Sequence, residues 1–430
     1  MSKTFQCLDD VSRREFAAFV AKSFLGVGLY SALSRDVVAD ESEFATLPQG
    51  TAKNCIYLYM NGGMTHLDTL DPKPGAETQG PIEAIETSAK GVMISELLPG
   101  LAKHMDKAAI VRSLSSTQGA HERGQYLMKT SYTQRGTIRH PAMGAWVLRL
   151  GGQTNKSLPG NVRIGNDSRH PGAGFMESKY APLPIGNPES GLQNSKVMRG
   201  ISTSEFERRV KLSNDFDTEF RAKFNQKKVR SYTNAYNDAI KLMSSKELEA
   251  FNIYNENERT RNAYGDNPFG QGCLLARRLV ENDVRFIEVS LGGWDTHQGN
   301  FDRVPERAQI LDQALSALLT DLADKGMLKE TLVVLATEFG RTPTINQNAG
   351  RDHYPRAFSG LLAGGGIKGG QAFGATDAKG VEVEDGFTEV PEFNATIANA
   401  LGLPLKKIVH SPTKRPFTVA DKSDPISALF

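Results

Sequence analysis

Two pairs of Asp and His residues are the part of this sequence best suited to chemistry. Asp295 and His297 follow an apolar run at residues 284–291, and Asp352 and His353 are neighbours in a later loop that contains glycine. A carboxylate beside an imidazole can ligate a divalent metal or act as an acid and base pair. One such pair alone is equally consistent with a hydrogen-bonded turn. The presence of two pairs favours a metal or phosphate-type site.

Three more candidate residues stand at the ends of other expected elements. His66 and Asp68 come shortly after the strand-like run at residues 55–60, and we assign both to the metal site with the two pairs above. His121 opens a helix-like segment, where free backbone amides can hold an anion. We assign His121 a catalytic role.

An arginine and several hydroxyl groups are candidates for handling an anionic ester. Arg341 follows a strand-like run, where its guanidinium can bind phosphate, sulfate or carboxylate through two hydrogen bonds; an ion pair with Glu338 is the alternative. Thr65 lies in the loop after the first expected strand and is preferred as nucleophile to the hydroxyl groups of residues 115–117. The latter are equally suited to capping the helix that begins at His121.

Alternating strand-like and helix-like segments predict the fold. Residues 55–60 are an apolar, aromatic-rich run, and residues 284–291 and 331–337 are further strand candidates. Residues 303–325 have the spacing of a long amphipathic helix between the last two, which makes a βαβ unit. We therefore predict an α/β fold with a mostly parallel sheet and helices on both faces. Residues 204–262 are charged and favour helix, which predicts a helical insertion, with a disordered linker as the alternative.

The amino terminus has the pattern of an export signal. Residues 12–16 form a twin-arginine pattern ahead of a modestly apolar segment at residues 16–33, which is too short for a comfortable bilayer span. Residues 37–39 offer the small side chains that a signal peptidase needs. We predict a twin-arginine signal peptide at residues 1–39, a mature domain at residues 40–430, no stable transmembrane span, and a periplasmic or extracellular location. A cytosolic helix that happens to contain an Arg pair is the alternative.

Composition limits the classes of partner. The 430 residues include 51 Lys plus Arg against 49 Asp plus Glu, a balance that gives no support for nucleic-acid binding or a polybasic membrane anchor. Of three cysteines, Cys55 and Cys273 lie outside the leader, and two buried free thiols are expected rather than a disulfide.

Five motifs in a fixed order resemble a known family. They are residues 61–74, residues 274–281, Gly-Trp-Asp-Thr-His at 293–297, Glu-Phe-Gly-Arg-Thr-Pro at 338–343 and Gly-Arg-Asp-His at 350–353. The set resembles the bacterial exported family called domain of unknown function 1501, over nearly the whole mature chain. That family is grouped with the alkaline phosphatase and sulfatase superfamily. The resemblance therefore implies a three-layer αβα sandwich and, in active members, metal-assisted attack on a phosphate or sulfate ester.

The resemblance also implies roles for single residues. Asp295 and His297 resemble the Asp and His from the loop of a late strand, and His353 resembles the final His ligand. Two departures stand beside these matches: Asn61 occupies the place of a metal-binding Asp, and Phe339 falls within the place of an adjacent Asp-His pair.

Two hypotheses follow from these observations. The first is an exported hydrolase or transferase that uses a divalent metal, zinc before calcium, magnesium or manganese, on a small-molecule or saccharide ester of phosphate or sulfate type. The second is a non-catalytic binding or assembly protein of the cell envelope, with a protein or polysaccharide partner, that keeps the fold. The departures at Asn61 and Phe339 favour the second hypothesis.

Overall fold

The computed structural model describes residues 50–193, 195, 200–223, 240, 242–243 and 245–430. The signal peptide predicted at residues 1–39 lies outside these residues, as does part of the insertion predicted at residues 204–262. Among the described helices, none has the length and apolar character needed to cross a membrane.

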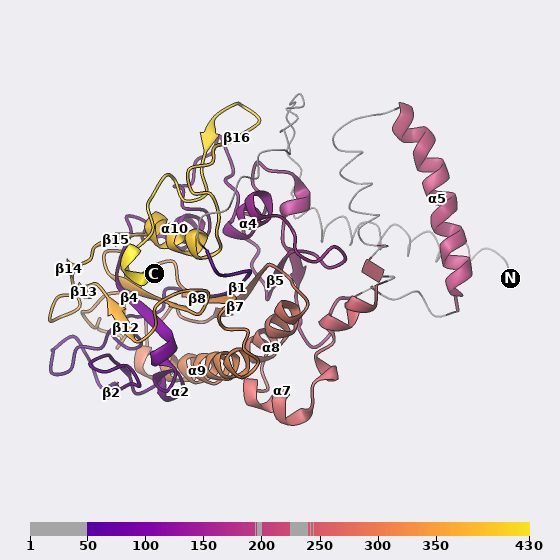
Figure 1. The fold of residues 1–430 in the computed structure, drawn as a ribbon. Coiled ribbons are helices and arrows are strands. Elements are labelled where there is room, and N and C mark those ends of the chain that lie inside the picture. The colour runs from indigo at the N-terminus through magenta and orange to yellow at the C-terminus, as the bar shows by residue number, and fades with distance from the viewer. Residues whose placement is uncertain (1–49, 194, 196–199, 224–239, 241, 244) are drawn as a thin grey trace.

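A nine-stranded sheet forms the centre of the molecule (Figure 1). In spatial order its strands are β12 (Gln371–Phe373), β4 (Ala108–Ser115), β11 (Phe358–Ala363), β8 (Thr331–Ala336), β1 (Asn54–Asn61), β7 (Phe286–Gly292), β5 (Asn161–Ile164) and β6 (Leu183–Ile185), and β15 (Thr388–Glu389) pairs with β4. Strand β11 is antiparallel to both of its neighbours, and the other pairs are parallel. The prediction of an α/β fold with a mostly parallel sheet is confirmed.

Helices cover both faces of this sheet, so that three layers result (Figure 1). One face carries α2 (Pro99–Ala102), α8 (Pro268–Glu281) and α9 (Asn300–Asp324), with α7 (Glu258–Tyr264) against α8 and α9; the other carries α3 (His121–Thr130), α4 (Met143–Gly151) and α10 (Val390–Ala400). Strand β1 explains why both faces are covered. Its residues Ile56 and Leu58 enter the core beneath α8 and α9, whereas Tyr57 and Tyr59 enter the core beneath α4 and α10. Side chains of a strand alternate between faces, and here both sets are apolar or aromatic.

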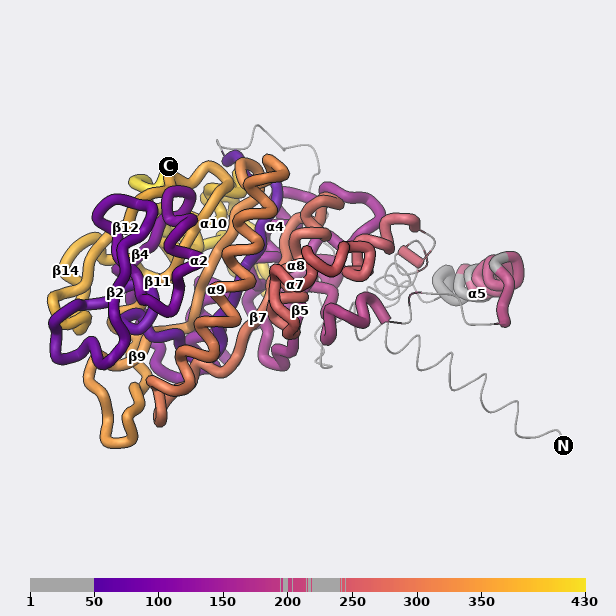
Figure 2. The backbone as a smooth tube through the Cα atoms, turned by 90° about the horizontal axis from the view of Figure 1, so that it is seen from below, coloured from indigo at the N-terminus to yellow at the C-terminus, as the bar shows by residue number. Residues whose placement is uncertain are grey.

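Short strand pairs and 3-10 helices lie outside the nine-stranded sheet. They are the strand pairs β2 (Ala84–Glu86) with β3 (Met93–Ser95), β9 (Gly340–Arg341) with β10 (His353–Tyr354), β13 (Ala375–Thr376) with β14 (Val383–Asp385) and β16 (Val409–His410) with β17 (Pro416–Phe417), and the 3-10 helices Met105–Lys107, Ser178–Tyr180, Lys246–Phe251, Ile253–Asn255 and Ser427–Leu429. Helix α5 (Thr203–Lys223), in the segment predicted as an insertion, lies apart from the three layers (Figure 2).

The two described cysteines lie in different cores. Cys55 of β1 belongs to the core beneath α4 and α10, and Cys273 of α8 belongs to the core on the opposite face of the sheet. Both are buried free thiols, as predicted.

Candidate metal centre

Parallel strands bring the chemistry-bearing loops together at one edge of the sheet. Strand β1 pairs in register with β7 and β8, so that Asn61 lies beside Gly292 and Tyr59 lies beside Ala336. The loops after these three strands therefore leave the sheet as neighbours. Gly62 makes the close approach achievable because a Cβ atom at this position would lie 2.6 Å from the backbone nitrogen of Asp295.

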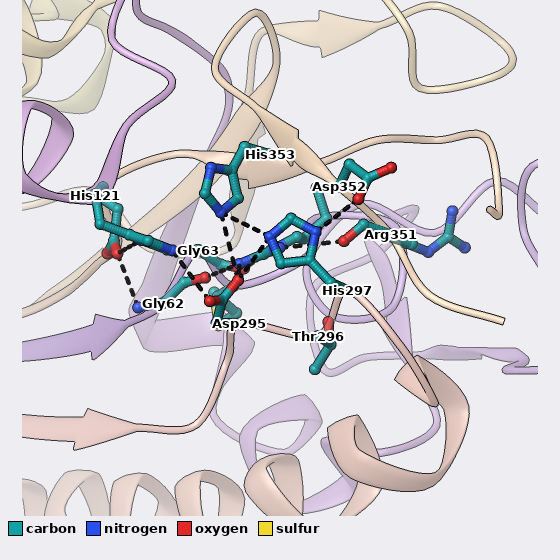
Figure 3. A network of polar contacts seen from close by, with 12 residues as sticks. Gly62, Gly63, His121, Asp295, Thr296, His297, Arg351, Asp352 and His353 are labelled. Carbon is teal, nitrogen blue, oxygen red and sulfur yellow. Dashed lines mark hydrogen bonds and ion pairs between the residues drawn. The ribbon is translucent and has the colours of Figure 1, made fainter. Parts of the chain in front are cut away.

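Three imidazole rings surround the carboxylate of Asp295 (Figure 3). The Nε2 atom of His121 lies 3.3 Å from Asp295 Oδ2, and the Nε2 atoms of His297 and His353 lie 3.2 and 3.4 Å from Asp295 Oδ1. The Nε2 atoms of His297 and His353 are 3.0 Å apart. The rings come from α3, from the loop after β7 and from β10, so the cluster joins three distant parts of the chain.

The other nitrogen of each ring faces a hydrogen-bond acceptor. His121 Nδ1 lies 2.8 Å from Glu338 Oε1, and His297 Nδ1 lies 2.6 Å from Asp352 Oδ1. His353 Nδ1 lies 2.8 Å from the carbonyl oxygen of residue 119. An acceptor at Nδ1 fixes the proton there in the neutral ring, which leaves an Nε2 lone pair directed at the cluster. All three lone pairs thus point to one place.

This arrangement fits a divalent cation. One ligand atom from each of His121, Asp295 and His353 lies within 4.8 Å of the other two. The Nε2 atom of His121 is buried and makes no hydrogen bond to a described residue, although Asp295 is close. Two Nε2 lone pairs at 3.0 Å, on His297 and His353, repel each other unless a proton or a cation lies between them. A metal would satisfy each of these atoms.

The protonation equilibria of the cluster have identifiable causes. The hydrogen bond with Glu338 raises the pKa of His121 above its ordinary value, whereas burial lowers the pKa of His353. Partial burial acts to raise the pKa of Asp295, but the hydrogen bond and charge of Arg341 outweigh it and lower this pKa to about 2. Asp295 is therefore a carboxylate at neutral pH.

Glu338 is the residue whose role the sequence did not reveal. Its side chain is fully buried and accepts hydrogen bonds from the Tyr59 hydroxyl at 2.9 Å, from the Gly62 backbone N–H at 2.8 Å and from His121. The sequence offered Glu338 as an ion-pair partner of Arg341. It pairs instead with an imidazole that α3 brings to the end of β8. Its place directly after a strand, at the carboxyl edge, was the available signal.

Arg341 supports the cluster, and each of its three guanidinium nitrogens donates to another described residue. The guanidinium is fully buried, lies 2.5 Å from Asp295 Oδ1 and donates to the carbonyl oxygens of Gly62, Gly63 and Arg351. The guanidinium that the sequence predicts to bind an anion is thus buried and engaged with the protein itself, where it favours the ionised form of Asp295.

Three predicted residues, Thr65, His66 and Asp68, are buried outside the imidazole cluster. Asp68 accepts two hydrogen bonds from Arg351, at 2.8 and 3.1 Å, and one each from Asn300 and Thr65, both at 2.9 Å. His66 is fully buried, and its Nε2 atom lies 2.9 Å from the carbonyl oxygen of residue 380. The structure does not bring these residues to the imidazole cluster, and the Thr65 hydroxyl is engaged with a carboxylate. The Asp352 carboxylate contacts the cluster through His297 Nδ1.

Phe339 has a packing role where the resemblance implies a ligand. Its ring centroid lies 5.1 Å from that of His121 and 4.7 Å from that of His353. Gly124 of α3 permits the contact between this helix and the strand end, because a Cβ atom there would lie 3.0 Å from the Phe339 ring and 3.2 Å from Glu338 Cβ. The aromatic ring thus covers one side of two candidate ligands.

A pocket of about 380 Å³ opens beside the cluster. His121 and Asp295 line it together with polar residues and glycines from α3, from the loop after β5 and from the carboxyl ends of β1 and β7 with the residues that follow them; these are Asn61, Gly62, Gln125, Asn166, Asp167, Ser168, Arg169, Gly292 and Gly293. No sequence motif marks the residues after β5, so the sequence alone does not predict their place in the pocket.

Comparisons with known proteins place the chain in a family and leave its activity open. No curated protein matches the sequence. Among solved structures, the chain is similar to the lipoteichoic acid synthase LtaP from Listeria monocytogenes at 10% identity and a TM-score of 0.41, over 91% of this chain and 79% of that one. It is also similar to a protein in the alkaline phosphatase superfamily from Vibrio parahaemolyticus (11% identity, TM-score 0.38, 96% and 78% covered). A third is the PsFucS1 sulfatase from Pseudoalteromonas sp. (11% identity, TM-score 0.37, 96% and 77% covered).

At these TM-scores the similarity carries no conclusion about substrate or reaction. The family comparison is stronger because it covers nearly the whole described chain. Residues 52–430 match the family described as "Protein of unknown function (DUF1501)", and the chain belongs to that family.

Proposed function

We propose that this protein is a divalent-metal-dependent hydrolase or transferase that acts on an ester of phosphate or sulfate type. The observation that carries the proposal is the convergence of three imidazole Nε2 atoms on the Asp295 carboxylate, each with its Nδ1 atom occupied elsewhere. Nitrogen-rich donor sets suit zinc, whereas calcium and magnesium prefer oxygen ligands. Zinc is therefore our first choice of metal, ahead of calcium, magnesium or manganese.

The residues of the cluster divide into ligands and supports. His121, His353 and Asp295 would hold the cation, with His297 as a further donor. A cation there supplies Lewis-acid polarisation of an ester oxygen. Glu338 holds the His121 ring in one orientation, and Arg341 keeps Asp295 ionised. Supports of this kind fix the tautomer and the direction of a ligand.

The predicted export signal and partners belong to the same proposal. Residues 12–16 have the twin-arginine pattern, which favours a periplasmic or extracellular location for the mature chain. A small-molecule or saccharide ester is the substrate class that we propose for such a location. Zinc loading before export would suit a pathway that transports folded proteins.

A non-catalytic binding protein of the cell envelope is the second candidate. One observation favours it: the Thr65 hydroxyl, the predicted nucleophile, is buried and donates to Asp68. In this alternative the cluster binds a metal for stability, and the pocket binds a polysaccharide or a protein segment without chemical change.

Elemental analysis of the purified full chain, followed by an ester screen, tests the proposal. The parent, a His353→Ala variant and a matched His410→Ala control are purified without chelators; His410 is exposed in β16, outside the cluster. Each protein is then assayed with 4-nitrophenyl phosphate and 4-nitrophenyl sulfate. We expect about one metal per chain and turnover in the parent and in the control, and loss of both in His353→Ala.

The outcomes separate the two candidates. Metal without turnover of either ester, under conditions where the parent is folded, favours the binding protein. Parent protein that takes up no metal even when zinc is supplied contradicts the proposed site.

A further inference from the structure

The loop after β5 presents two exposed side chains to the pocket. Ser168 and Arg169 line the pocket together with His121 and Asp295, and both are exposed. They lie between two residues that are anchored in the protein, Asp167 and His170. The loop therefore has a fixed base and a free tip.

A buried charge cluster forms that base. Lys129 is 3% exposed, and its Nζ atom lies 2.5 Å from Asp167 Oδ2 and 2.6 Å from Glu288 Oε1. His170 Nε2 lies 3.1 Å from Glu288 Oε2, and the Arg169 backbone N–H donates to Asp167 Oδ1 at 3.0 Å. Removing either end of such a buried ion pair is costly, so the loop is held firmly on both sides of its tip.

The same helix anchors the loop and supplies a candidate ligand. His121, Gln125 and Lys129 are spaced four residues apart on α3 and therefore share one face of the helix. His121 reaches the metal cluster, Gln125 lines the pocket, and Lys129 holds Asp167. The position of the loop tip is thus tied to the position of the cluster.

The Arg169 side chain is available to a ligand. The Asp167 carboxylate contacts Lys129, which it shares with Glu288, and the Asp295 carboxylate is paired with Arg341. Within the described part of the chain, the Arg169 guanidinium makes no hydrogen bond or ion pair, and only its backbone N–H is engaged. A free guanidinium in a pocket suits a phosphate or sulfate group, which it can bind through two parallel hydrogen bonds.

The rest of the lining offers neutral polar groups. Gln125 Nε2 donates to Asn61 Oδ1 at 2.6 Å, which leaves the Asn61 amide N–H groups and the Gln125 carbonyl oxygen free to bond to a ligand. Asn166 and Ser168 add further donors and acceptors. The lining residues include no aliphatic side chain and no Phe, Tyr or Trp, so these donors and acceptors match a group rich in hydroxyls better than an aromatic or alkyl group.

We propose that Arg169 binds the anionic group of the substrate and that the neighbouring amides bind hydroxyls, so that the substrate is an anionic ester of a saccharide or similar polyol. The proposal rests on the proposed function, because His121 and Asp295 line the same pocket. It assigns to Arg169 the role of a binding residue that determines specificity.

Calorimetric titration of the zinc-loaded full chain tests this assignment. The probes are glucose 6-phosphate, glucose 6-sulfate, inorganic phosphate and glucose. Arg169→Met removes the charge and keeps most of the side-chain length, Arg169→Lys keeps the charge, and Arg415→Met is the matched control because Arg415 is exposed and lies outside the pocket lining. Glucose 6-phosphate against glucose 6-sulfate distinguishes the two anions.

We expect the parent to bind at least one of the two sugar esters more tightly than inorganic phosphate. That sugar ester and inorganic phosphate should each bind more tightly than glucose. Arg169→Met should weaken anion binding about ten- to hundredfold, the usual effect of losing hydrogen bonds to a charged group, with metal content unchanged. Arg169→Lys should lose less, and Arg415→Met should bind as the parent does. Gln125→Met should reduce the preference for the sugar ester over inorganic phosphate.

Failure of this inference differs from failure of the proposed function. If zinc-loaded parent binds no anion, or if Arg169→Met binds as tightly as the parent, the assignment of Arg169 is wrong while the metal site stands. If the parent takes up no zinc, the proposed function fails; anion binding that Arg169→Met abolishes in that protein would still support Arg169.

Discussion

Replacing Glu338 by Gln isolates the contribution of the buried carboxylate to metal binding. Glu338 is fully buried and accepts hydrogen bonds from Tyr59, Gly62 and His121, with a longer one from Thr337 at 3.5 Å. Gln has nearly the same shape, and its oxygen can still accept from Gly62 and His121. What the variant loses is the negative charge beside the imidazole.

The expected change in zinc affinity follows from the loss of this charge. A hydrogen bond to a charged group contributes about 1.5–3 kcal/mol, against about 0.5–1.5 kcal/mol for a neutral one, so the bond to His121 should weaken by about 1–1.5 kcal/mol. A difference of about 1.4 kcal/mol is a factor of about ten in affinity, and replacing such supporting residues in metal sites typically costs about 10- to 100-fold. We expect Glu338→Gln to raise the Kd for zinc by about tenfold or more.

The pH dependence should change in the same variant. Glu338 raises the pKa of His121, so in the metal-free protein this residue contributes stability that is complete below the ordinary pKa near 6.5 and is lost as pH rises through the raised value. Zinc competes with the proton, so its affinity should increase over the same interval. Without the carboxylate, both changes should move to lower pH.

Competition with a chromophoric chelator between pH 6 and pH 9 measures these quantities, and thermal unfolding shows whether the variant is folded. Glu330→Gln is the matched control, since that carboxylate is half exposed in a surface ion pair with Lys53. A folded Glu338→Gln protein whose Kd for zinc matches the parent and the control would refute the role given to Glu338.

Three further predictions concern the elements around the cluster. Lys129→Met leaves Glu288 buried without its cation, so the free energy of unfolding in urea should fall by about 3–5 kcal/mol. Burial acts to raise the pKa of Glu288, but the charge of Lys129 outweighs burial and lowers this pKa, so the parent should lose this stability as pH falls below about 4.5. A variant as stable as the parent at pH 7 would contradict this account. Gly124→Ala places a methyl group 3.0 Å from the Phe339 ring, so that the ring or the helix must shift. We expect a cost of about 1–3 kcal/mol in urea unfolding together with part of the zinc affinity, whereas a neutral effect on both would show that the contact is dispensable. Zinc at about 100 times its Kd should stabilise the chelator-treated parent by about 2.7 kcal/mol in the same assay, and His353→Ala should abolish this gain; a similar gain in the variant would place the metal elsewhere.

The sequence predicts the sheet and the edge on which the site lies. Strands β1 and β8 are recognisable because each is a largely continuous apolar run, which is typical of strands buried on both faces, and β7 is apolar apart from Glu288 and Ser290. Because the three strands are parallel neighbours, the residues just after them lie at one edge of the sheet. Asp295 and His297, which follow β7, lie at this edge and contact each other. The order of strands and helices along the chain was therefore sufficient to predict the sheet and the edge at which the site lies.

The partners of individual side chains were beyond sequence reasoning. Glu338 and His121 are 217 positions apart, and only the packing of α3 against the end of β8 brings them together. Arg351 and Asp68 are 283 positions apart and form a buried ion pair that removes Asp68 from the list of free carboxylates. Arg341 looks like an anion-binding residue until its contacts with backbone carbonyl oxygens are seen. Which polar groups are already satisfied is a property of the fold.

The placement of the cysteines has a consequence for redox chemistry. Cys55 and Cys273 lie in cores on opposite faces of the sheet, and burial raises the pKa of both thiols, so neither forms the reactive thiolate. The candidate ligands are nitrogen and oxygen atoms, which do not undergo thiol–disulfide exchange. The described part of the chain can therefore gain or lose a cation in oxidising surroundings with its covalent structure unchanged.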